Sequence, residues 1–85
     1  MGRKRLTEKE LHFSQELGGR IAKIREFKKL SQEQLGILAF RDVTPTENAA
    51  QQRISAIETN SKHITAFDVF RIIKALRIKP YELIP

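Results

Sequence analysis

Apolar residues recur along the chain at the spacing of amphipathic helices, and no alternating pattern typical of strands interrupts them. From Ser14 onward, intervals of four, three and three positions mark one face of a first helix: Leu17, Ile21, Ile24 and Phe27. Within it, Gly18 and Gly19 each weaken the helix by about 1 kcal/mol relative to alanine. We therefore expect another backbone to pack closely against the two glycines.

Further helices are predicted from their start signals. Capping boxes, in which side chains satisfy the free N–H groups of a helix start, occur at four places: Thr7 to Glu10, Ser31 to Gln34, Thr44 to Glu47 and Thr65 to Asp68. The third box is strengthened by Pro45 at the first helical position, and its helix is expected to run to about Glu58. Pro80 can start a short fifth helix.

The predicted helices each have an apolar side. In the second helix these residues are Leu35, Leu38 and Ala39, and in the third they are Ala50, Ile54 and Ile57. The opposite side of the third helix is polar, with Asn48, Gln52 and Ser55, and Gln51 flanks it. The predicted stripe of the fourth helix is Ala66, Val69, Phe70, Ile73 and Leu76, with Phe67 and Ile72 beside it.

Length and composition indicate one small all-α domain. The chain has 85 residues, no cysteine and two isolated histidines, so we expect neither disulfides nor a metal site. We find no carboxylate pair, activated nucleophile or phosphate-cradling glycine loop, and predict no enzyme activity, cofactor or small-molecule substrate. Apolar runs of three or four residues predict no membrane span, and we expect a cytoplasmic protein.

The net charge of +6 is unevenly distributed. Residues 1–29 carry +5, residues 30–61 carry −2 and residues 62–85 carry +3. Two basic flanks around an amide-rich middle are consistent with a protein that binds a polyanion at both ends and recognises it with uncharged side chains. Ordinary solubility is the alternative explanation, because net charges of about 2 to 8 are usual for small domains.

Several fragments, in this order, are similar to the phage-repressor and Cro type of helix-turn-helix domain. They are Leu17 to Ile21, Ile24 with Arg25, Leu30 to Leu35, Ile54 to Glu58, and Leu76 to Leu83. Together they span about four-fifths of the chain. The resemblance implies a five-helix, lambda-repressor-like DNA-binding domain over residues 14–85, preceded by a basic arm, residues 1–13, that is either mobile or partly helical.

This resemblance also implies how double-stranded DNA would be bound. The third helix would enter the major groove, while the second would lie near the backbone with Gln32 on a phosphate. Gln51 and Gln52 match the positions that touch base edges, and glutamine can bond adenine in bidentate fashion. Second-rank contacts are Asn48 and Ser55, and Arg53 is expected to reach a phosphate.

One departure from the family pattern lies between the second and third helices. The chain has roughly eight more residues there than the usual helix-turn-helix, so either the third helix is extended at its N-terminus or the extra residues form a loop beside the DNA. This segment adds Arg41, Thr44 and Thr46 as possible contacts. Lys62 is a further candidate phosphate ligand, and the arm residues Arg3, Lys4 and Arg5 could enter a minor groove.

The resemblance assigns structural roles as well. Arg25 and Glu58 are expected to form a partly buried ion pair between the first and third helices. We predict a homodimer that reads a two-fold operator through an apolar C-terminal surface: Phe67, Ile72, Tyr81, Leu83 and Ile84. Alternatively the last residues fold back onto the monomer's own core. The competing functional class is a protein-interaction module, such as an antitoxin or adaptor, in which DNA binding is secondary.

Overall fold

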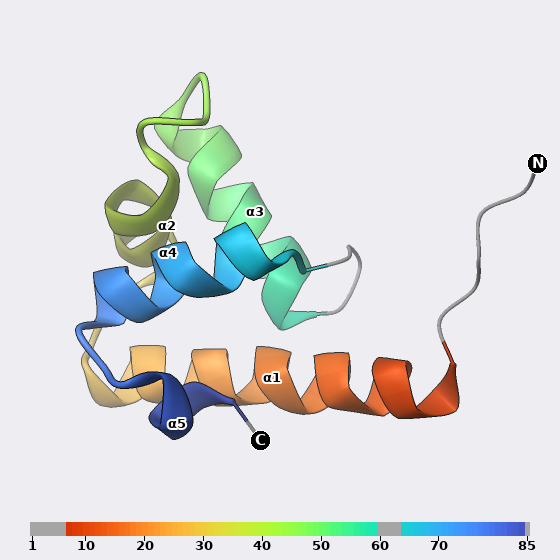
Figure 1. Cartoon of the computed structure of the whole chain (residues 1–85). Coiled ribbons are helices and arrows are strands. Elements are labelled where there is room, and N and C mark those ends of the chain that lie inside the picture. Colours follow the sequence, from red (N-terminus) through yellow and green to blue (C-terminus); the bar gives the residue numbers. More distant parts are fainter. Residues whose placement is uncertain (1–6, 60–63, 85) are drawn as a thin grey trace, which may run out of the picture.

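A computed structural model describes residues 7–59 and 64–84, and these residues form five α-helices without a strand (Figure 1). In chain order they are α1 (Glu8–Phe27), α2 (Gln32–Phe40), α3 (Glu47–Glu58), α4 (Ala66–Leu76) and α5 (Pro80–Leu83). The all-α prediction is confirmed.

Helices α1 and α2 provide the main contacts between the elements. Helix α2 packs against both α3 and α4, and α1 underlies the bundle, contacting α3, α4 and α5. The N-terminal turns of α1 extend beyond the other helices in Figure 1. This arrangement leaves α3 with one face against α2 and α1, and the other face outward.

Three of the predicted helix starts are confirmed. Capping boxes are present at Thr7, Ser31 and Thr65, with the side-chain oxygen of each accepting a hydrogen bond from the third helical N–H. Helix α1 therefore begins at Glu8, six residues before Ser14, and the later part of the predicted arm is helical. The predicted fifth start at Pro80 is also found.

The predicted start of the third helix is wrong by two residues. Thr46, and not Thr44, caps α3, and its oxygen accepts from the N–H of Ala49 at 3.0 Å. The Thr44 hydroxyl instead donates to the carbonyl of Phe40 at 2.8 Å. Pro45 therefore lies in the linker that follows α2, before the first turn of α3.

The core is built from all five helices. Its buried apolar residues are Leu17, Ile21, Leu35, Ala39, Phe40, Ala50, Ile54, Ile57, Ile72, Ile73, Leu76 and Leu83. The predicted inner face of α3 is confirmed by this set. Phe27 and Leu38 were predicted on apolar faces but are exposed, Phe27 to 87%.

The buried stripe of α4 differs from the predicted one. Ile72 is fully buried, whereas Phe70 is 66% exposed. Apolar residues occupy more than half of the circumference of this helix, so periodicity alone allowed two overlapping stripes. Contacts with α2 and α1 select the one that contains Ile72, Ile73 and Leu76.

Candidate nucleic-acid interface

Two glycines bring α3 into backbone contact with its neighbours. A Cβ atom on Gly36 of α2 would lie 2.7 Å from the carbonyl of Ala50, and one on Gly18 of α1 would lie 2.7 Å from the carbonyl oxygen of Ile57. Gly19 has nothing within 4 Å of such an atom. The close approach expected at the glycine pair is thus found at Gly18 alone, and the sequence analysis missed Gly36.

The predicted ion pair of Arg25 and Glu58 is present and fixes the C-terminal end of α3. Arg25 donates from Nε to Glu58 Oε2 at 2.7 Å and from Nη2 to Oε1 at 3.2 Å, and from Nη1 to the Leu30 carbonyl at 2.8 Å. The two side chains are 13% and 5% exposed. The hydrogen bond to Glu58 raises the pKa of the Arg25 guanidinium. This bidentate pair joins α1, α3 and the start of α2.

Gln32 belongs to the same network. Its Nε2 donates to Glu58 Oε1 at 2.9 Å, and the side chain is half-buried. A phosphate contact from this amide nitrogen, as the resemblance implies, would require this hydrogen bond to be given up. The position of Gln32 at the first turn of α2 still places backbone N–H groups beside it at the positive end of the helix dipole.

The outward side of α3 carries amides and a hydroxyl. We define the amide face as Asn48, Gln51, Gln52 and Ser55, of which Asn48 and Gln52 are exposed and the other two are half-buried. No charged residue lies among the four. Their donors and acceptors can bond the edges of base pairs or the polar groups of a protein equally well.

Arg53, the single cation of α3, has a structural role. Its Nη2 donates to Asp68 Oδ1 at 2.9 Å, and its guanidinium lies 4.8 Å from the centre of the Phe40 ring. Asp68 is 1% exposed and also accepts from the backbone N–H of Thr65 at 3.1 Å. The phosphate contact predicted for Arg53 does not fit, because a stranded Asp68 would be left buried without its counterion. The capping-box signal located Asp68 but gave no sign of this partner.

The extra residues between α2 and α3 form a loop, and α3 is not extended through them. Arg71 of α4 holds this loop, donating from Nη1 to Asp42 Oδ1 at 2.6 Å and to the Ala39 carbonyl at 3.1 Å. The hydrogen bond from Arg71 lowers the pKa of the Asp42 carboxyl. Sequence analysis missed this contact, because opposite charges 29 positions apart give no local signal.

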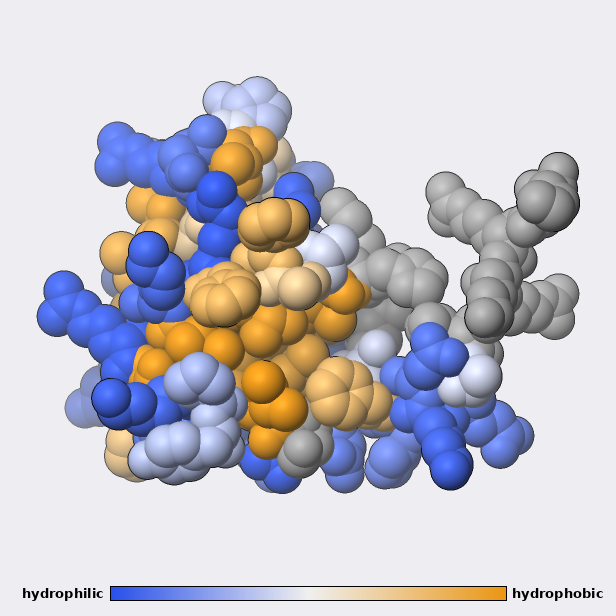
Figure 2. All heavy atoms as spheres, viewed as in Figure 1, coloured by the Kyte–Doolittle hydropathy of each residue, from blue (hydrophilic) through white to orange (hydrophobic). Residues whose placement is uncertain are grey.

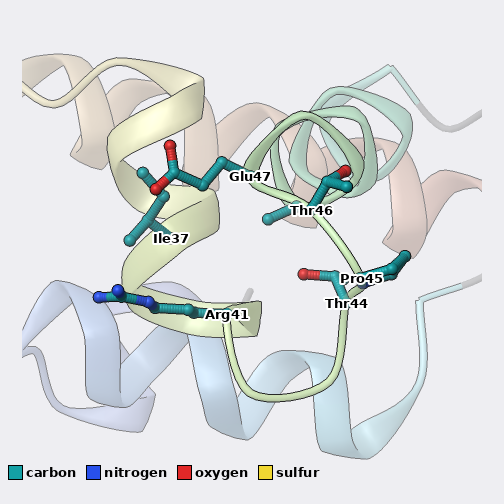
Figure 3. A pocket seen from close by; sticks show the side chains of 7 residues that line it. Ile37, Arg41, Thr44, Pro45, Thr46 and Glu47 are labelled. Carbon is teal, nitrogen blue, oxygen red and sulfur yellow. The ribbon is translucent and has the colours of Figure 1, made fainter.

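The loop closes one side of a cavity of about 280 Å³ between the end of α2 and the start of α3 (Figure 3). Its lining is Ile37, Arg41, Thr44, Pro45, Thr46, Glu47 and Ala50. In Figure 3, Glu47 reaches from α3 toward α2 while Arg41 extends from the end of α2. One acid and one base line the cavity, so it does not concentrate positive charge.

The predicted interface residues fall into two groups. Ile72 and Leu83 are buried in the core, which corrects their assignment to a dimer surface, and the predicted alternative that the C-terminus folds back is correct for Leu83. Phe67, Tyr81 and Ile84 are exposed. Apolar side chains gather over α4 and continue toward α5 and α1 on the face seen in Figure 2.

The other predicted DNA contacts, Arg3, Lys4, Arg5 and Lys62, lie outside the residues that the structure describes. Within the described helices, none has the length and apolar character needed to cross a membrane. No family model, curated protein or solved structure matches this chain.

Proposed function

We propose that this chain is a sequence-specific, double-stranded DNA-binding regulator of transcription, a homodimeric repressor with the lambda-repressor-like fold that its sequence resembles. The observation that carries the proposal is the amide face of α3, which is presented on a helix whose opposite side is locked into the core. Asparagine and glutamine side chains can bond adenine N6 and N7 in the major groove.

The packing of α3 supports this reading. Backbone contact at Gly36 and the bidentate ion pair at Glu58 hold its two ends against α2 and α1. A recognition element must be positioned closely to distinguish bases, and rigid elements position side chains better than loops do. Helix α3 is therefore held in a fixed position relative to α2, as base recognition requires.

Charge around the amide face argues for two copies. Residues 30–61 contain two basic residues, and Arg53 is paired with Asp68, which leaves Arg41 for a phosphate. Even with Lys62 and the arm added, one monomer makes few cationic contacts, and one small module rarely gives enough affinity and specificity. We therefore propose that two copies bind a two-fold operator, pairing through exposed residues that include Phe67, Tyr81 and Ile84.

Selection from a pool of random double-stranded DNA tests the proposal. We expect a two-fold motif whose half-sites are centred about one helical turn apart, ~34 Å, as for other dimeric readers of this kind. A selected motif without two-fold symmetry would reject the homodimer. Failure to enrich any sequence, at low salt and with a protein shown to be folded, would reject the proposed function.

A protein-interaction module is the second candidate, and a specific observation favours it. Phe67 is 80% exposed and Phe70 is 66% exposed, and with Leu38 they line a groove of about 450 Å³ between α2 and α4. A gel shift with random DNA at several salt concentrations separates the two candidates. A DNA-binding protein should retard the DNA in a salt-dependent way, whereas a pure interaction module should not.

A further inference from the structure

A surface of mixed apolar and basic character lies where α1 ends and α4 turns into α5. An apolar slot of about 410 Å³ opens there, lined by Lys23, Ile24, Phe27, Lys28, Ile78 and Glu82. Phe27 is 87% exposed, while Ile24 and Ile78 pack against the core beneath it. An aromatic ring so fully exposed between two lysines does nothing for the core.

Both helices that end here close with the same pair of backbone hydrogen bonds. After α1, Leu30 N–H bonds the Arg25 carbonyl and Lys29 N–H bonds the Glu26 carbonyl. At the end of α4, the N–H groups of Ile78 and Arg77 bond the carbonyls of two residues of its last turn, Ile73 and Lys74 respectively. This pair of hydrogen bonds is the Schellman motif, which requires a residue in the left-handed conformation and normally uses glycine there.

The left-handed residues here are Lys29 and Arg77, with φ of 59° and 56°. Among the described residues they are the only non-glycine residues with positive φ. A side chain with a Cβ atom is strained in this conformation, and glycine would relieve the strain. The chain therefore keeps cations at two positions where backbone energetics favour glycine.

We define the basic end as Lys23, Lys28, Lys29, Arg77 and Lys79. Lys23 and Lys28 line the slot, and the others are adjacent in sequence to its lining residues. In the described part of the chain none of the five forms an ion pair, and the carboxylate of Glu82 accepts from the backbone N–H of Lys79 at 2.6 Å. Hydrophilic side chains crowd this end, at the left of Figure 2. The basic end thus holds five cations and one carboxylate, a net positive charge, around an apolar slot.

We propose that the basic end binds an acidic segment of a partner protein, which inserts an apolar side chain beside Phe27. Charge complementarity requires the partner to be negatively charged, and the slot requires it to carry an apolar side chain. Double-stranded DNA meets the first requirement through its phosphates but not the second, because it presents no apolar side chain to fill the slot. An acidic peptide with an apolar anchor satisfies both, with the aromatic and cationic groups that dominate binding energies in protein interfaces.

The proposal is tested by fluorescence anisotropy with the full chain and a labelled peptide of alternating Glu and Ser residues that carries one central Phe. The companion probes are the same peptide with Ser in place of Phe, and labelled single- and double-stranded DNA. We expect salt-sensitive binding of the Phe-containing peptide that is about tenfold tighter than that of its Ser counterpart. Phe27→Ser should remove this preference, whereas Phe13→Ser, at an exposed aromatic near the other end of α1, should leave it unchanged.

Substitutions at the left-handed positions separate charge from strain. Lys29→Gly and Arg77→Gly should each weaken peptide binding severalfold and raise the melting temperature by about 3–6 °C. Lys29→Ala and Arg77→Ala remove the same charges but keep a Cβ atom, so they should weaken binding without that gain in melting temperature. Circular dichroism is the check that each variant is folded.

Three outcomes overturn the proposal. Equal affinity for the two peptides would mean that the slot takes no anchor. Absence of peptide binding by the folded wild-type chain at low salt would mean that the basic end is not a peptide site. Loss of DNA binding in Phe27→Ser, with peptide binding unaffected, would assign this end to nucleic acid. None of these results depends on whether α3 reads DNA, because Phe27 and the amide face lie on different helices.

Discussion

Charged side chains are used differently in two regions of the molecule, the surroundings of the amide face and the basic end. Around α3, three arginines are committed to carboxylates, in the pairs Arg25–Glu58, Arg53–Asp68 and Arg71–Asp42. At the basic end, five cations have no such partner in the described structure. Charge near α3 is used to position a neutral reading surface, whereas charge at the basic end is left available for a partner.

Backbone geometry separates the two regions in the same way. Near α3, glycines are present where a Cβ atom would collide with a neighbouring backbone. At the basic end, glycine is absent from two positions that favour it. The first region is therefore optimised for packing, and the second carries strain that packing does not explain. Substitutions that remove one charge or add one methyl group should affect the two regions very differently.

The largest difference is expected from removing one charge. Glu58→Ala strands the Arg25 guanidinium and the Gln32 amide in a largely buried site, and should lower the free energy of unfolding by about 3–5 kcal/mol. Lys28→Ala, the matched change at the basic end, should leave stability nearly unchanged because Lys28 is exposed and unpaired. Urea denaturation followed by circular dichroism measures both. Similar losses in the two variants would contradict the comparison.

Adding one methyl group should give the next largest effect. Gly36→Ala pushes a Cβ atom to within 2.7 Å of the Ala50 backbone and should cost about 2–3 kcal/mol. Gly19→Ala, in the open interior of α1, should instead stabilise the chain by up to about 1 kcal/mol. Thermal unfolding of the two variants measures the difference. A Gly36→Ala protein as stable as wild type would show that α2 and α3 can separate at no cost.

Substitutions in the amide face should change DNA affinity without changing the stability of the fold. Gln52→Ala removes an exposed side chain and should cost about 1–3 kcal/mol of affinity for the selected DNA site, with relaxed preference at one or two base pairs. Its unfolding curve should match that of wild type. Gln15→Ala, an exposed glutamine on α1, serves as the control and should change neither property. An unchanged selected motif in Gln52→Ala would mean that base reading lies elsewhere, and first of all in the loop before α3.

Much of the fold could be predicted because its signals are local. Capping boxes span four residues, so the starts at Ser31 and Thr65 were predicted correctly. The same rule failed at Thr44, whose hydroxyl finds a carbonyl at the end of α2 instead. Thr46, on the other side of Pro45, caps α3 instead, and the sequence analysis did not consider it for this role.

Contacts across the fold explain most of what the sequence did not reveal. The side of α4 that is buried depends on where α2 and α1 lie, so Ile72 and Phe70 were misassigned. Arg53 was interpreted as a phosphate ligand because its partner, Asp68, is 15 positions away on another helix. The pair of Arg25 and Glu58 was predicted only because the family resemblance supplied the long-range pairing.

The smallest expected effect concerns the Asp42–Arg71 pair, which holds the loop before α3. The hydrogen bond from Arg71 lowers the pKa of Asp42 in the folded chain, so this carboxylate favours folding above the ordinary aspartate pKa of about 4. The contribution is lost as the pH falls through the lowered pKa. Wild type should therefore melt slightly above Asp42→Asn at pH 7, and this difference should disappear in acid.

Salt sharpens the same test, because Asp42 is exposed and its attraction to Arg71 is screened. The difference in melting temperature between wild type and Asp42→Asn should shrink at high salt, and should be smaller than the effects of Glu58→Ala and Gly36→Ala under all conditions. Arg71 keeps its hydrogen bond to the Ala39 carbonyl in the variant, so the end of α2, from which the loop starts, should stay attached to α4. A difference that persisted undiminished well below pH 4 would show that the negative charge of Asp42 is not what holds the loop beside the amide face.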